Sequence, residues 1–219
     1  MNLKHKFSEN DLLRIKTAVK IAEEKISGEI VPVIVESSGD YTIANYKGSL
    51  IGASLAFVFM IILDRYIIDE AVNTLFYDPV FIFLMVILGG VLGFILPNFS
   101  DPLKRLLVAR RYQDIVTRQC AETAFLEEQV FNTRQRTGIM IFISFFEHEV
   151  IVMADRGISK VVEQKQWDQI VQDIIKSIRN RKVVEALETG IKECGDILLE
   201  KGFRKSADDI NELQDDLRI

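Results

Sequence analysis

Two uninterrupted apolar runs in the first half of the chain constrain its fold more than any other feature. Residues 49–63 read SLIGASLAFVFMIIL and residues 79–97 read PVFIFLMVILGGVLGFILP, and neither run contains a charged residue. A membrane-spanning helix needs about 20 apolar residues, and a helix of a soluble protein normally keeps one polar face. The second run has that length, and the first reaches it by extending past Asp64 and Arg65 into apolar residues 66–68. We therefore expect a two-helix transmembrane hairpin, and two helices buried in a soluble core are the alternative.

The charges that flank the two runs predict the orientation of this hairpin. Basic residues lie outside it on both sides, at Lys47, Lys104, Arg105, Arg110 and Arg111. The segment between the runs carries Arg65 against four acidic residues, Asp64, Asp69, Glu70 and Asp78. Cytoplasmic segments next to membrane spans are enriched in Lys and Arg, so we expect both soluble parts in the cytoplasm and the short connection outside. The first 45 residues contain no apolar segment of the kind that a signal peptide needs.

Net charge and cysteine usage narrow the class of protein further. The net charge is −5, and no basic stripe with interleaved aromatic residues is present, so we expect no binding to nucleic acid. The basic cluster at residues 104–111 would favour anionic lipid headgroups, although its simpler role is to set the topology. Cys120 and Cys194 lack CxxC spacing and lie among apolar neighbours, which indicates reduced thiols and agrees with a cytoplasmic location.

Apolar spacing predicts helices at both ends of the remaining chain. Ser8 and Asp11 form the start signal of a first helix, which we expect to end at Gly28. Its apolar stripe consists of Leu12, Ile15, Val19, Ala22 and Ile26. A long helix is expected over residues 102–133, with Ile115, Ala121, Ala124 and Phe125 on its buried face. Two further helices follow, with stripes from Trp167 to Ile178 and from Val184 to Leu198.

Three short apolar segments predict the strands. Residues 30–35 are apolar throughout, which is typical of a strand covered on both faces, and Pro32 places this strand at a sheet edge or a bulge. Residues 139–146 are the most apolar segment outside the hairpin and are expected to form the central strand. Residues 150–154 form a third strand, which pairs with the second as a hairpin through a solvated turn at residues 147–149. The first two strands would be parallel, because the crossover between them contains the membrane hairpin and the long helix.

The expected fold is therefore α/β, a small mixed-sheet sandwich with helices on both faces, interrupted by the transmembrane hairpin. Residues 1–45 would form the first part of the domain and residues 99–203 the remainder, with the hairpin inserted between them at residues 46–98. Residues 204–219 form a charged tail that we expect to be loosely held. In the alternative interpretation of this tail, Leu213 and Leu217 dock it onto a partner.

Three segments of this pattern resemble the TPM domain, a family named after thylakoid, photosystem-repair and acetylcholine-receptor-modulating members. They are SGEIVPV at residues 27–33, RTGIMIFI at residues 136–143, and VIVMADRGI at residues 150–158 with the downstream Trp167. The resemblance covers about residues 8–203, and the hairpin is similar to that of a bacterial membrane-protein branch. It implies a small α/β sandwich in the bacterial inner (plasma) membrane. Some relatives are reported as calcium-binding, some as phosphatases, and others as helpers of membrane-complex assembly or repair.

Glu29 and Asp155 are the candidate metal ligands. Glu29 begins the first strand and Asp155 follows the third, so the two carboxylates are expected near one edge of the sheet. Calcium takes six to eight oxygen ligands, and two carboxylates with backbone carbonyls would supply part of that set. In the alternative interpretation Asp155 caps a turn or pairs with Arg136 or Arg156. Relatives often carry an Asp-Asn-Gly-like sequence before the central strand, whereas Arg136, Thr137 and Gly138 occupy those positions here.

No sequence motif indicates a particular reaction. A Gly-x-Ser-x-Gly elbow, a P-loop, an HExxH motif and a GxGxxG motif are all missing from the sequence. The first hypothesis is therefore a non-enzymatic, membrane-anchored module that binds a membrane-protein partner during assembly, quality control or repair of membrane complexes. The second is a divalent-cation-dependent phosphatase that uses Asp155 and Glu29. Gly89 and Gly93 stand in GxxxG spacing, which favours close helix packing within the hairpin, with packing between protomers as the alternative.

Overall fold

The chain folds into two compact units, one of which is formed by two separate stretches of the sequence. A computed structural model describes residues 6–66, 78–205 and 211–219. The sheet unit consists of Met1–Gly39 and Ile115–Ile219, and the hairpin unit consists of Asp40–Asp114. Asp69 and Glu70, named above, and residues 206–210 of the expected tail lie outside the described residues.

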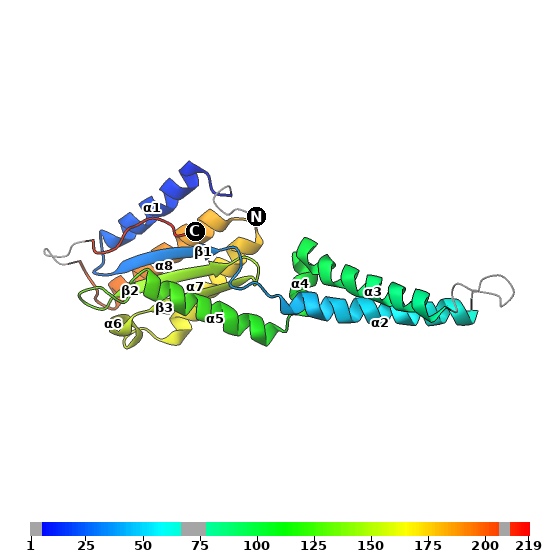
Figure 1. Cartoon of the computed structure of the whole chain (residues 1–219). Coiled ribbons are helices and arrows are strands. Elements are labelled where there is room, and N and C mark those ends of the chain that lie inside the picture. The colour runs from blue at the N-terminus through cyan, green and yellow to red at the C-terminus, as the bar shows by residue number, and fades with distance from the viewer. Residues whose placement is uncertain (1–5, 67–77, 206–210) are drawn as a thin grey trace. The chain divides into compact units, whose positions relative to one another are not determined.

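The sheet unit contains a three-stranded mixed sheet (Figure 1). Its strands are β1 (Glu29–Val35), β2 (Gly138–Ser144) and β3 (Glu149–Ala154), in the order β1-β2-β3. β1 runs parallel to β2 with Glu29 opposite Gly138, and β3 pairs antiparallel with β2. The parallel pair, the hairpin and the edge position of Pro32 are therefore confirmed.

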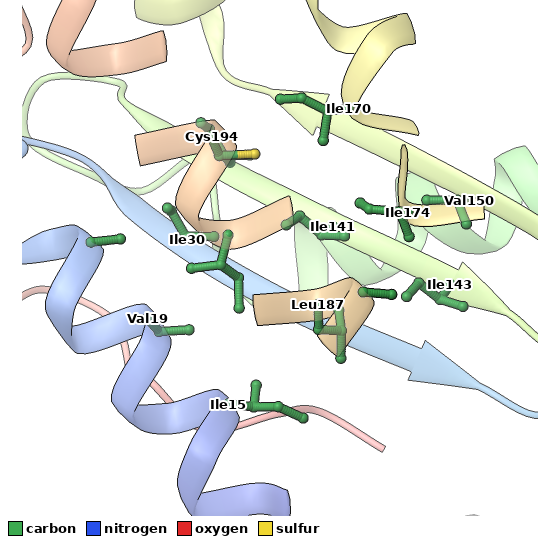
Figure 2. Close-up of a cluster of buried hydrophobic side chains, with 14 of the residues drawn as sticks. Ile15, Val19, Ile30, Ile141, Ile143, Val150, Ile170, Ile174, Leu187 and Cys194 are labelled. Carbon is green, nitrogen blue, oxygen red and sulfur yellow. The ribbon is translucent and has the colours of Figure 1, made fainter. Parts of the chain in front are cut away.

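Helices cover both faces of this sheet, which confirms the expected fold class. On one face, α1 (Glu9–Glu23), α7 (Gln164–Arg179) and α8 (Val183–Glu200) bury side chains such as Ile30, Ile141 and Ile143 (Figure 2). On the other face, α5 (Arg110–Glu127) supplies Ala121, which packs with Val31, Val33, Met140 and Phe142. Because successive residues of a strand point to opposite faces, a strand covered on both sides must be apolar throughout.

Local signals explain where the helices begin and why one breaks. The Asp11 N–H donates to Ser8 Oγ and the Ser8 N–H donates to the Asp11 carboxylate, which is a complete capping box at α1.

The prediction of one long helix over residues 102–133 is wrong, because this segment is divided into α4 (Asp101–Leu107) and α5. The backbone is extended at the buried Val108, and the Gln113 side-chain amide donates to the Val108 carbonyl and so holds the break. Ile115, expected on the buried face, is exposed.

The hairpin unit consists of α2 (Ile43–Tyr66) and α3 (Pro79–Ile95), followed by a 3-10 turn, η3 (Leu96–Phe99), and by α4. Two of its helical segments, Ile43–Leu63 and Pro79–Phe99, are long and apolar enough to cross a membrane. Glycines bring α2 and α3 together, since a Cβ added at Gly48 or Gly52 would overlap the carbonyl oxygen of Gly93 or Gly89. The GxxxG pair therefore packs within the hairpin, as the sequence favoured.

The end of the chain is bound to the sheet, which corrects the expectation of a loosely held tail. We call residues 211–219 the C-terminal strap; it ends beside β1 in Figure 1. The Arg218 N–H donates to the Pro32 carbonyl at 3.0 Å, and the Ile34 N–H donates to the Arg218 carbonyl at 2.9 Å. Leu213 and Leu217 pack against the two core clusters, one on each face of the sheet. The strap thus covers the open edge of β1 with residues of the same chain.

Candidate functional site

Glu29 and Asp155 lie at the same end of the sheet, where β1 and β2 begin and β3 finishes. We call this place the Gly138 end. Glu29 is the register partner of Gly138, and the Asp155 N–H donates to the Gly138 carbonyl at 2.9 Å. The two predicted ligands therefore flank one residue of the central strand from opposite sides.

Glycines at the Gly138 end allow the backbone segments to approach closely. A Cβ at Gly138 would overlap the Val130 carbonyl oxygen, and one at Gly157 would crowd the Arg136 carbonyl oxygen. The Gly157 N–H donates to that same Arg136 carbonyl at 3.0 Å. The glycines in the RTG and DRG segments thus serve the fold, since close backbone contact requires a residue without a side chain.

The Asp155 carboxylate already interacts with groups of the same chain. Its Oδ1 accepts the Arg156 N–H at 2.7 Å and caps the short helix α6 (Arg156–Ser159). Its Oδ2 is buried without a hydrogen bond and lies 3.7 Å from the Arg136 guanidinium. The Arg136 guanidinium also donates to the Phe131 carbonyl at 2.6 Å. The Arg136 guanidinium thus lies beside the Asp155 carboxylate, where a metal ion would bind. Among the described residues, no group of three or more His, Cys, Asp or Glu side chains is arranged to hold a metal ion.

Glu29 holds the C-terminal strap. Its carboxylate accepts the N–H of Glu212 at 3.0 Å and the N–H of Leu213 at 3.3 Å. Burial raises the pKa of Glu29, and these two hydrogen bonds act in the opposite direction because they favour the charged form. A metal ion bound by Glu29 would compete with the strap for the same oxygens.

Glu23, beside the Gly138 end, is a buried acid that the sequence reading missed. Its Oε1 accepts the Ile30 N–H at 2.8 Å, and its Oε2 is buried without a hydrogen bond. Burial raises its pKa to about 8, and the nearby Glu29 and Asp215 add to the shift. These acids line a cavity of about 140 Å³. The available signal was its position four residues after Val19, which continues the apolar stripe of α1.

Glu147, at the other end of the sheet, is also buried, so the expectation of a solvated turn is wrong for this residue. Its side chain is 0% exposed and accepts the Ser38 N–H at 2.9 Å and the Ser144 hydroxyl. The Ser38 hydroxyl in turn donates to Ser144 Oγ at 3.1 Å. The chain after β2 remains bonded to the end of β1, since the Phe145 N–H donates to the Val35 carbonyl, and this continued pairing carries Glu147 inward. Ser144 is buried as well, whereas Ser37, whose hydroxyl donates to Glu147 Oε1 at 3.5 Å, is exposed.

The fold of this chain is similar to that of a solved structure, the NMR structure of the BA42 protein from the psychrophilic bacterium Bizionia argentinensis. The TM-score is 0.58 at 17% sequence identity, and the match covers 97% of this chain and 94% of that chain. At this identity the likeness shows the fold. Residues 105–197 match the family model described as TPM domain, so the chain contains a TPM domain, as its sequence motifs indicated. No curated protein matches the sequence.

Proposed function

We propose that this protein is a membrane-anchored TPM module that binds a protein partner at the cytoplasmic face of a bacterial inner membrane. The observation that carries the anchoring is the exposure of the two apolar helices, since only 11% of the apolar stretch of each helix is buried. A core helix of a soluble protein buries most of its apolar surface, and exposed apolar patches of this extent mark a membrane or protein contact.

A binding role is favoured over hydrolysis because the candidate acids already serve the fold. Glu29 binds the strap, and Asp155 caps α6 beside Arg136. By contrast, α1 and α8 form a groove of about 440 Å³ in which Leu13 and Ile21 are exposed. A groove between two helices with apolar side chains at helical spacing suits an amphipathic helix of a partner.

Membrane extraction tests the anchoring. We expect the full chain to stay in the membrane pellet after an alkaline carbonate wash, and a variant without residues 43–99 to lose this retention. Release of the full chain into the supernatant would show that the apolar helices do not span the bilayer.

Crosslinking in intact membranes, followed by purification of the full chain, tests partner binding. We expect a specific crosslinked protein that is lost in Leu13→Asp, because a charge in the groove disfavours an apolar partner. Leu126→Asp is the matched control, since Leu126 is an equally exposed leucine on α5. A crosslink that persists in Leu13→Asp, or that is lost equally in both variants, would reject the groove as the binding surface.

The second candidate function is a divalent-cation-dependent phosphatase. The buried Asp155 Oδ2 without a hydrogen bond favours it, because an orphaned carboxylate oxygen is a potential ligand. The test is calcium-stimulated hydrolysis of a phosphate ester by the purified full chain, together with a rise in melting temperature on calcium titration. Asp155→Ala should abolish both effects, and a calcium response that survives this substitution would remove Asp155 from the site.

A further inference from the structure

The segment that follows α3 exposes large apolar side chains outside the spanning helices. Phe99 is 83% exposed and Leu106 is 80% exposed, which makes them the most exposed large apolar residues in the described part of the chain. They lie at the end of η3 and within α4, and we call residues 96–111 the foot of the hairpin.

Hydrogen bonds from neighbouring helices hold the foot in place. The Lys47 ammonium donates to the Leu107 carbonyl at 3.0 Å and so binds the end of α4 to α2. The Asn45 side-chain amide donates to Asn98 Oδ1 at 2.9 Å and binds η3 to α2. The Gln113 amide donates to the Arg105 carbonyl at 3.0 Å. The exposure of Phe99 and Leu106 is therefore a property of an ordered surface and not of a frayed end.

The same segment concentrates positive charge in a chain whose net charge is −5. Four basic residues lie between residues 104 and 111, namely Lys104, Arg105, Arg110 and Arg111. Asp101 is the acidic residue of the foot, and Asp114, just beyond it, pairs with Arg110 at 2.9 Å. A surface that joins exposed apolar side chains to basic ones matches the boundary between acyl chains and anionic headgroups.

We propose that the foot lies in the headgroup layer of the cytoplasmic leaflet and binds anionic phospholipids. Phe99 and Leu106 enter the acyl boundary, and the basic side chains contact lipid phosphates. The inference rests on the proposed membrane anchoring. Continuity favours lipid over a protein partner, because the exposed apolar surface of α3 runs directly into the foot at Leu96 and Phe99.

The depth of a spin label at position 106 tests the placement of the foot. The Leu106→Cys variant of the full chain carries Cys120→Ala as well, while the fully buried Cys194 is retained. After reconstitution into phosphatidylcholine vesicles with one anionic lipid, phosphatidylglycerol, we expect the label to be accessible to oxygen and shielded from a water-soluble nickel chelate. A label at Leu126→Cys is the matched control and should be accessible to the chelate.

Lipid selectivity tests the charge part of the proposal. A fluorophore at position 106 is quenched by spin-labelled phosphatidylglycerol or by spin-labelled phosphatidylcholine, and the ratio of the two association constants is measured. We expect a preference of several-fold for the anionic lipid at low salt, which approaches one at about 1 M salt. Each of Lys104→Gln and Arg105→Gln should lower the ratio by up to about fivefold, whereas Lys192→Gln in the sheet unit should leave it unchanged.

The outcomes separate this inference from the proposed function. A chain that does not float with vesicles refutes the anchoring itself. A chain that floats, but whose label at position 106 reports water, refutes the foot alone. A label shielded from both oxygen and chelate indicates cover by protein and also overturns the proposal. A ratio near one at low salt removes the preference for anionic lipid.

Discussion

Removal of the Glu147 carboxylate should destabilise the sheet unit strongly. In Glu147→Ala, the Ser38 N–H and the Ser144 hydroxyl both lose a buried acceptor. A buried donor left without a partner costs about 1–3 kcal/mol. The Ser144 hydroxyl recovers part of this loss, because Ser38 Oγ lies 3.1 Å away. We therefore expect the free energy of unfolding to fall by about 2–4 kcal/mol, which corresponds to about 4–16 °C in melting temperature.

Tryptophan fluorescence of the full chain in mild detergent measures this change. Trp167 is the single tryptophan of the chain and is buried in the core of the sheet unit, so its signal follows that unit. Glu147→Gln keeps one acceptor oxygen and should lose about 1 kcal/mol, and Glu163→Ala, at an exposed position, should stay within about 0.5 kcal/mol of the wild type. The reasoning fails if Glu147→Ala also stays within that range, or if the Gln variant is as unstable as the Ala variant.

Three further predictions concern other contacts. Because the pKa of Glu23 is raised to about 8, the folded state keeps a proton that the unfolded state releases above about pH 4.5. The free energy of unfolding should therefore fall by at most about 4–5 kcal/mol as the pH rises from about 4.5 to about 8. Urea titrations at several pH values should show that this free energy depends less on pH in Glu23→Gln than in the wild type. Arg218 and Glu128 form a partly buried ion pair at 2.7 Å, and a double-mutant cycle should give a coupling energy of about 1 kcal/mol; no coupling would mean that this ion pair does not help to hold the strap. Gly93→Ala should lower the temperature at which helix is lost, measured by circular dichroism, because its Cβ would overlap the Gly48 carbonyl oxygen. Gly90→Ala, whose Cβ meets only ordinary contacts, should leave this temperature unchanged. Equal effects of the two substitutions would contradict the close packing of α2 on α3.

The strands and their order were predictable because their signals are local. Residues 30–35 and 139–146 are apolar at every position or nearly so, and this pattern requires cover on both faces of a sheet. The long crossover then required a parallel pair, and the register of Glu29 with Gly138 agrees with it. The same reasoning brought Glu29 and Asp155 to one end of the sheet.

The roles of individual polar residues were not predictable, because their partners lie far away in the sequence. Glu147 follows an apolar strand in a charged triplet that resembles a solvated turn, and its burial depends on Ser38. Glu29 looks like a free ligand until the strap, at Glu212 and Leu213, supplies two N–H donors. The break at Val108 has no glycine or proline to announce it. Each of these features is decided by tertiary hydrogen bonds that no local spacing encodes.

The placement of the hairpin between β1 and β2 has a consequence for the order of folding. Residues 36–137 separate two strands that must pair side by side, so β1 is synthesised long before its partner. Closing a flexible loop of about 100 residues costs about 4 kcal/mol beyond a constant, and each halving of the loop saves about 0.6 kcal/mol. A hairpin that forms first, with Asn45 bonded to Asn98, shortens the effective loop to its two flanking segments. The saving is small in stability, but it makes formation of the hairpin the natural first step and pairing of the sheet the last. A chain whose hairpin fails to form is left with β1 unpaired and prone to aggregation.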